Sequence, residues 1–216
     1  MQTTEKALDR VLGELRRNGL LLESDSVFPS VVSLVVGERI EGSWWGHKDG
    51  HLIFNLMKRL RSSPEILKAK LISGKVTLVY KTLWPELLAV GSSRDRWQTV
   101  NLSTDANGLF HLVEKKGKIR SDEIEWWGKS VIGDSVRELE KRLLVYSEEI
   151  HTAKGSHAKI IRSWTLLANE SAIPMTVNVE RAKEKFETLV RQMNKKHDGH
   201  GRLPWPHAEK QDSSDS

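Results

Sequence analysis

Glu149 and His151 have the residue types and the spacing of a general acid–base pair. They are two residues apart in a segment with strand-like alternation, so their side chains are expected on one face and Glu148 on the other. A carboxylate beside an imidazole raises the imidazole pKa and prepares it to move a proton during catalysis. An ordinary ion pair at the edge of a hairpin would use the same two residues, and both interpretations stay open.

A second group, around His47 and His51, has the i, i+4 spacing that zinc sites use on helices. Asp49 lies between the two histidines and Glu41 is near in sequence. The flanking glycines favour a loop, however, and no third ligand is evident. We therefore expect neither a metal site nor another cofactor.

Basic and small polar residues concentrate in three places that could contact nucleic acid. They are a helical segment with Arg137, Lys141 and Arg142, a turn with Lys154, Ser156, His157 and Lys159, and a shorter turn with Lys75. Lys and Arg contact phosphates and guanine edges. The alternatives are a solvated helix, whose interleaved glutamates would repel phosphates, and polar hairpin turns that need such residues anyway.

Trp44 and Trp45 stand side by side in a Gly-rich loop. The chain holds eight tryptophans, a high count, and most are expected in cores. For this pair we expect a packing plug between two units of the fold. The alternative is a wedge or stacking platform for a base.

These residues need a scaffold, and periodicity predicts one in the second half of the chain. Helices are predicted from 104 to 116, around 121–127, and from Asp134 or Ser135 to Leu143, with glycines at 117, 128 and 133 as breaks. The period then drops towards two, which predicts strands at 144–146 and 158–164 around a Lys-Gly-Ser turn.

The first half repeats this plan. Helices are predicted at 4–18, 26–36 and 50–61, followed by a hairpin at 68–80 and a helix at 84–90. Three helices followed by a hairpin is the winged-helix arrangement, whose third helix usually enters the DNA major groove.

We therefore expect a mainly α protein with small β-hairpins, an α+β chain of tandem winged-helix units. The expected divisions are 1–90 for the first unit, 91–170 for the second, 171–194 for a C-terminal helix, and 195–216 for a disordered tail.

Composition narrows the classes of function. The absence of cysteine excludes disulfides, Cys-ligated zinc and thiol nucleophiles. A net charge of +5 favours an anionic partner. The longest apolar run, at 31–36, is too short to span a membrane, and the N-terminal segment is polar, so we expect a cytoplasmic protein. The oligomeric state is not predicted.

Four segments resemble a family of small bacterial proteins that carries the label AlkZ-related. They read GSWWGH at 42–47, KLISGKVTLV at 70–79, LWPELLAVG at 83–91 and SEEIHTAKGSHAK at 147–159. The resemblance covers about 29–164. More remotely, the chain is similar to winged-helix DNA glycosylases of the AlkZ type, which excise alkylated or crosslinked bases. Those enzymes use a Gln-x-Gln or His-x-Gln motif, which this sequence lacks, so no catalytic residue carries over.

The main hypothesis is a DNA-binding protein that serves DNA repair or transcription. One alternative is a glycosylase-like enzyme with Glu149 and His151 as the water-activating pair. The other is a protein-interaction module, because winged helices also bind proteins.

Overall fold

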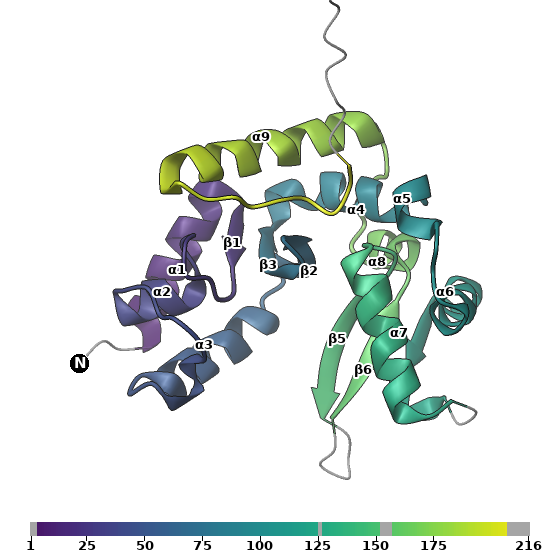
Figure 1. Cartoon of the computed structure of the whole chain (residues 1–216), viewed down its shortest axis with the longest axis horizontal. Coiled ribbons are helices and arrows are strands. Elements are labelled where there is room, and N and C mark those ends of the chain that lie inside the picture. The colour runs from purple at the N-terminus through teal and green to yellow at the C-terminus, as the bar shows by residue number, and fades with distance from the viewer. Residues whose placement is uncertain (1–3, 125–126, 152–156, 207–216) are drawn as a thin grey trace, which may run out of the picture.

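The computed structural model describes residues 4–124, 127–151 and 157–206 (Figure 1). The first unit consists of α1 (Thr4–Asn18), β1 (Leu20–Leu22), α2 (Val31–Val36), the 3-10 turn η1 (Trp44–Gly46), α3 (Gly50–Arg61), β2 (Ile66–Ile72) and β3 (Lys75–Tyr80). Its three strands form an antiparallel sheet in the order β1-β3-β2. The predicted helices and hairpin are present, and β1 is an addition that the sequence pattern did not predict.

The second unit has a similar order of elements, with one short helical turn in place of α2 and η1. It consists of α6 (Thr104–Lys116), β4 (Lys118–Arg120), the 3-10 turn η3 (Ser121–Glu123), α7 (Lys129–Lys141), β5 (Tyr146–His151) and β6 (His157–Arg162). Its sheet has the order β4-β6-β5, so the first strand again pairs with the last. The expected α+β class is confirmed.

The predicted start of α7 is wrong. The helix begins at Lys129, and Gly133 lies inside it rather than breaking it. Ile132, Val136 and Leu139 on its inner face are buried, and their burial outweighs the roughly 1 kcal/mol that a glycine costs within a helix.

Three apolar clusters hold the chain together. One fills the first unit beneath α1, α2 and α3, and a second fills the second unit between α6 and α7. The third and largest lies between the units, where Leu67 and Val79 of the first sheet share a cluster with Tyr146 and Trp164 of the second half. The two units are therefore joined by a common core.

Four helices surround this shared core: α4 (Trp84–Ser92), α5 (Arg96–Thr99), α8 (Trp164–Glu170) and α9 (Val179–His197). In Figure 1, α9 runs across the top of the molecule, above both units. The sequence predicted α4 and α9, but α8 was not predicted. Trp164 begins α8 and packs so closely that a Cβ on Gly91 would come within 2.6 Å of its ring.

The expected disorder from residue 195 onwards is wrong for residues 195–206; residues 207–216 lie outside the described part. Helix α9 continues to His197, and the chain then turns back along the body. Leu203 and Trp205 are buried in the shared core. Two apolar side chains among polar neighbours are thus enough to anchor this segment, because each fills a place in the core.

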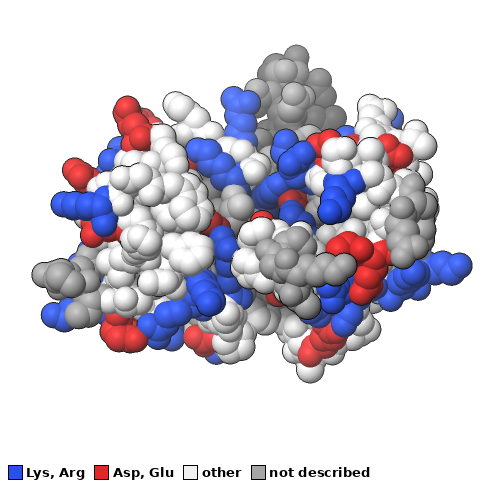
Figure 2. All heavy atoms as spheres, turned by 90° about the horizontal axis from the view of Figure 1, so that it is seen from below, with Lys and Arg blue, Asp and Glu red and all other residues white. Residues whose placement is uncertain are grey.

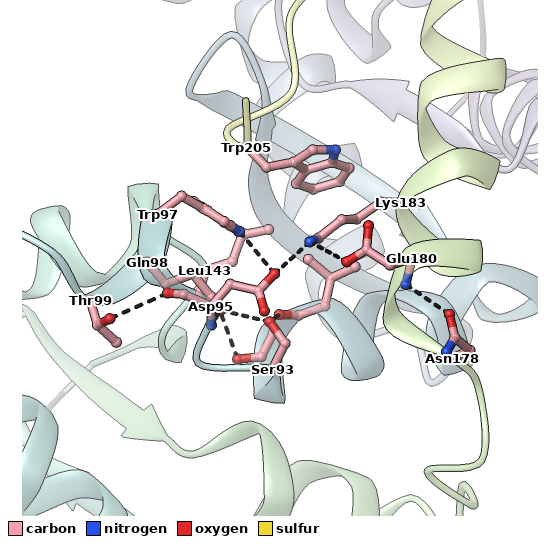
Figure 3. Close-up of polar contacts among 12 residues, drawn as sticks. Ser93, Asp95, Trp97, Gln98, Thr99, Leu143, Asn178, Glu180, Lys183 and Trp205 are labelled. Atoms are coloured by element: carbon pink, nitrogen blue, oxygen red, sulfur yellow. Dashed lines mark hydrogen bonds and ion pairs between the residues drawn. The ribbon is translucent and has the colours of Figure 1, made fainter. Parts of the chain in front are cut away.

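Polar contacts also fasten this segment to both parts of the molecule. The backbone N–H of Ser73 donates to the carbonyl of Arg202 at 2.7 Å, at the tip of the first hairpin. Figure 3 shows Trp205 above Trp97, next to the contact in which Lys183 Nζ of α9 lies 2.5 Å from Asp95. The C-terminal segment and α9 therefore tie the first unit to the joint between the units.

Candidate nucleic-acid interface

A cleft of about 450 Å³ lies between the two units. Its charged lining consists of Arg61, Lys68, Lys70, Arg137 and Lys159 on the basic side and Glu23, Glu140 and Glu149 on the acidic side. Figure 2 shows the molecule from below, with Lys and Arg side chains gathered in the middle of this face, between the units. Because basic side chains outnumber acidic ones, the cleft favours an anion.

Glu140 forms the polar centre of this cleft. Its carboxylate receives Lys159 Nζ at 2.5 Å and the hydroxyl of Ser147 from the second unit, and Lys70 Nζ of the first unit lies 2.8 Å away. Burial disfavours the charged carboxylate, but these hydrogen bonds outweigh it and leave the pKa of Glu140 below its ordinary value. Glu140 is thus an ionic clamp between the units.

Lys68 is the exception among the cleft lysines. No hydrogen bond or ion pair joins it to any residue in the described part of the chain, although its side chain is half-buried. Burial lowers the pKa of Lys68 and the nearby Arg61 lowers it further, while the carboxylates of Glu23 and Glu149 offset only part of this shift. An incoming anion would relieve both effects.

Arg61 connects the cleft to helix α3. Its guanidinium lies 3.6 Å from Glu23 and 3.8 Å from Glu149, beyond hydrogen-bonding distance. Arg61 is the last residue of α3, so the outer face of this helix leads directly into the cleft. Along that face His51, Asn55 and Lys58 are exposed, and α3 contains no acidic residue.

Three of the predicted DNA contacts, Lys75, Lys159 and Arg142, have partners within the protein, and their contact with DNA stays a prediction. Lys75 Nζ lies 2.6 Å from the buried carboxylate of Asp25. Lys159 is bound by the Glu140 clamp. These ammonium groups serve folding contacts that a sequence pattern does not reveal.

Arg142 has the most extensive set of internal partners of the three. Its guanidinium donates to the backbone carbonyls of Val100 at 2.7 Å, Trp97 at 3.2 Å and Asn101 at 3.2 Å. These hydrogen bonds hold the loop between α5 and α6 against the end of α7.

The other predicted contacts of the second unit remain predictions. Arg137 lines the cleft and forms an exposed ion pair with Asp134 one turn earlier in α7. Lys141 is exposed at the end of the helix. His157 is exposed on β6, whereas Lys154 and Ser156 lie outside the described residues.

Glu149 and His151 lie in β5, on a strand as predicted, but the structure shows no contact between them. Glu149 lines the cleft and faces Arg61. The imidazole of His151 lies against that of His157, with ring centroids 4.5 Å apart. The arrangement provides a carboxylate in the cleft without an imidazole hydrogen-bonded to it, so a proton-moving pair stays a prediction.

The histidines beside the tryptophan pair do not form a metal site. Instead, Nδ1 of His47 accepts a hydrogen bond from the backbone N–H of Asp49 at 3.1 Å. Within residues 4–124, 127–151 and 157–206, no three His, Asp or Glu side chains lie close enough together to hold a metal ion.

Trp44 and Trp45 occupy a different place from the one predicted. Trp44 packs against the core of the first unit alone, and 67% of Trp45 is exposed, so the expected plug between the units is wrong. Their rings stack on one another at a centroid distance of 4.4 Å. The stacking interpretation therefore stays open.

Several important residues were missed in the sequence. Lys68 and Lys70 share one face of β2, which the lysine alternation in this segment could have indicated. Gln98 had no such signal: it is fully buried, and its amide donates to the carbonyls of Arg142 and Leu143, both at 3.1 Å (Figure 3). Only the fold reveals that Gln98 connects α5 to the end of α7.

Comparison of the chain with protein-family models, with curated proteins and with solved structures finds no match. Among the helices that the structure describes, none is both long enough and apolar enough to cross a membrane.

Proposed function

We propose that this protein binds DNA through a pair of winged helices, in repair or in transcription, with the first unit making the principal contact. Support for the winged-helix assignment comes from the shared order of helix, strand, short helix, helix and two strands, with the first strand paired to the last. In such units the helix before the hairpin usually enters the major groove, which corresponds here to α3 and α7.

One observation carries the proposal: the exposed face of α3 has no acidic residue and ends at the cleft where Lys68 has no partner in the described structure. A phosphate near Arg61 and Lys68 would give Lys68 the direct partner that it lacks among the described residues, in a cleft that also holds Glu23 and Glu149. Lys58, three residues before Arg61, would contact a neighbouring phosphate of the same backbone.

The test is the affinity for a short duplex, measured by fluorescence anisotropy over a series of salt concentrations. Each phosphate contact contributes a slope of roughly −0.9 to a plot of log affinity against log salt. We expect a slope steeper than that of a single contact. A flat plot, or no binding at low salt, would contradict the proposal.

Two single variants locate the contact. Lys68→Ala should weaken binding and make the slope less steep by about one. Arg191→Ala removes an equally charged, exposed residue from α9, on the side of the molecule opposite α3 in Figure 1, and should change neither quantity.

A further inference from the structure

We propose that Trp44, Trp45 and Phe54 form a stacking platform for an unpaired nucleobase, so that the protein prefers single-stranded or locally opened DNA to an intact duplex. This inference rests on the proposed function, because it names the form of DNA that the α3 face binds.

The platform is an exposed aromatic surface. Trp45 is 67% exposed and Phe54 is 43% exposed, a high exposure for side chains of this size. The indole of Trp45 stacks on that of Trp44 with an interplanar angle of 18°, and its centroid lies 5.9 Å from that of Phe54. Trp44 therefore supports Trp45 from one side, and much of the Trp45 surface remains open.

The local backbone holds this platform in place. The hydroxyl of Ser43 accepts a hydrogen bond from the N–H of Trp45 at 3.4 Å, and the N–H of His47 donates to the carbonyl of Trp44 at 3.0 Å. Gly50 allows α3 to start directly against this turn, because a Cβ there would lie 3.1 Å from the carbonyl oxygen of Trp45. A preformed aromatic surface loses little conformational entropy when a ligand stacks on it.

The charges next to the platform favour a nucleotide as the occupant. Lys58 is exposed one helical turn after Phe54, roughly 6 Å further along α3, within reach of the phosphate beside a stacked base. The single carboxylate between Trp45 and Phe54 in the sequence, Asp49, lies 3.6 Å from His47. An aromatic surface beside a lysine that has no ion-pair partner in the described part of the chain resembles the combination that single-strand binding uses.

Three labelled ligands of related sequence test the inference at matched salt: an oligothymidine-containing single strand, a duplex with an internal unpaired bubble, and the intact duplex. The wild type should bind the first two more tightly than the third. Trp45→Ala should weaken binding of the first two roughly five- to hundredfold, the range for loss of one aromatic–base stack, and should change duplex binding little.

Two further readouts separate stacking from charge. Trp45→Ala should lower the affinity for the single strand without changing its salt slope, whereas Lys58→Ala should make the slope less steep by about 0.7. Trp45→Phe should retain most of the affinity. Because Trp45 is exposed, the thermal unfolding of Trp45→Ala should match the wild type, which shows that the variant is folded.

The outcomes are distinguishable. Salt-dependent duplex binding with no preference for unpaired DNA, or with no effect of Trp45→Ala, overturns the inference and leaves DNA binding intact. Failure of every oligonucleotide to bind at low salt overturns the proposed function as well. A protein partner that survives nuclease treatment and is lost in Trp45→Ala also overturns the inference, because the platform would then be a protein-docking surface.

Discussion

Helices α3 and α7 have the same position in the repeated order of elements, but their charged residues do different work. All charged residues of α3 are basic: Lys58, Arg59 and Arg61. Helix α7 has three basic residues, Lys129, Arg137 and Lys141, and three acidic ones, Asp134, Glu138 and Glu140. The two helices therefore differ in surface charge although they occupy equivalent positions in the fold.

Two of the three acidic residues of α7 bind other parts of the protein, and Asp134 pairs with Arg137 within the helix. Glu138 accepts hydrogen bonds from the backbone N–H of Ser103 at 3.1 Å and from its hydroxyl at 2.7 Å, at the start of α6. Glu140 binds Lys70 and Lys159. Helix α7 thus serves chiefly to join the units. On α3, Arg59 is paired with Glu5 at 2.6 Å, and Lys58 has no ion-pair partner among the described residues.

The largest expected effect is on stability, from Glu140→Ala. This change leaves two half-buried ammonium groups without their carboxylate, and breaking a buried ion pair costs about 3–5 kcal/mol. Urea unfolding should show a loss of that order. Lys58→Ala on α3 is the control, because an exposed substitution should stay within about 0.5 kcal/mol of the wild type. Equal effects at the two positions would remove the distinction between the helices.

Arg142→Ala should produce the next largest effect, a loss of roughly 2 kcal/mol in the free energy of unfolding. Several backbone carbonyls would lose a charged hydrogen-bond donor. Lys141→Ala, one residue earlier and exposed, is the matched control for charge. If Arg142→Ala were as stable as this control, the structural role of the guanidinium would be wrong.

Acid should weaken the clamp on α7. The pKa of Glu140 is lower in the folded chain than its ordinary value of about 4.5. Its contribution to stability is therefore complete above the unfolded pKa and is lost as the pH falls through the folded pKa. Unfolding measured at neutral and at acid pH should show a smaller acid-induced loss in Glu140→Gln than in the wild type. An identical loss in both proteins would show that Glu140 does not titrate in this way.

Lys68→Met should give the smallest change in stability, between no change and a gain of about 1 kcal/mol. It removes an ammonium group that burial disfavours and that has no ion-pair partner among the described residues. Lys70→Met should instead destabilise, since Glu140 would lose a partner. A marked loss of stability in Lys68→Met would show that Lys68 serves the fold rather than a ligand.

Sequence periodicity was a sufficient guide to the long elements. Residues 50–61 were predicted as a helix, and α3 has those bounds, because its apolar residues repeat strictly at helical spacing. Strands β1 and β4 were missed because three residues are too few to show alternation. Gly133 misled the prediction of α7, since packing of the neighbouring side chains outweighs the local cost of glycine.

The site was harder to predict than the fold, because the sequence does not reveal which side chains form ion pairs with one another. Lys75 and Lys159 have the residue type and the hairpin position of phosphate contacts, but carboxylates distant in the sequence bind both. Lys68 differs from them only in having no such partner among the described residues, a property that depends on the assembled fold. The charges of α3, in contrast, could have been read from its sequence.

The central claim, that α3 rather than α7 makes the principal contact with DNA, is tested most directly by two double variants. Salt-dependent affinity should be compared for the wild type, Lys58→Ala/Arg61→Ala on α3, and Arg137→Ala/Lys141→Ala on α7. Each double variant removes two positive charges. The account predicts a slope less steep by about two for the α3 variant and a nearly unchanged slope for the α7 variant. The reverse result, or equal losses in both, would contradict it.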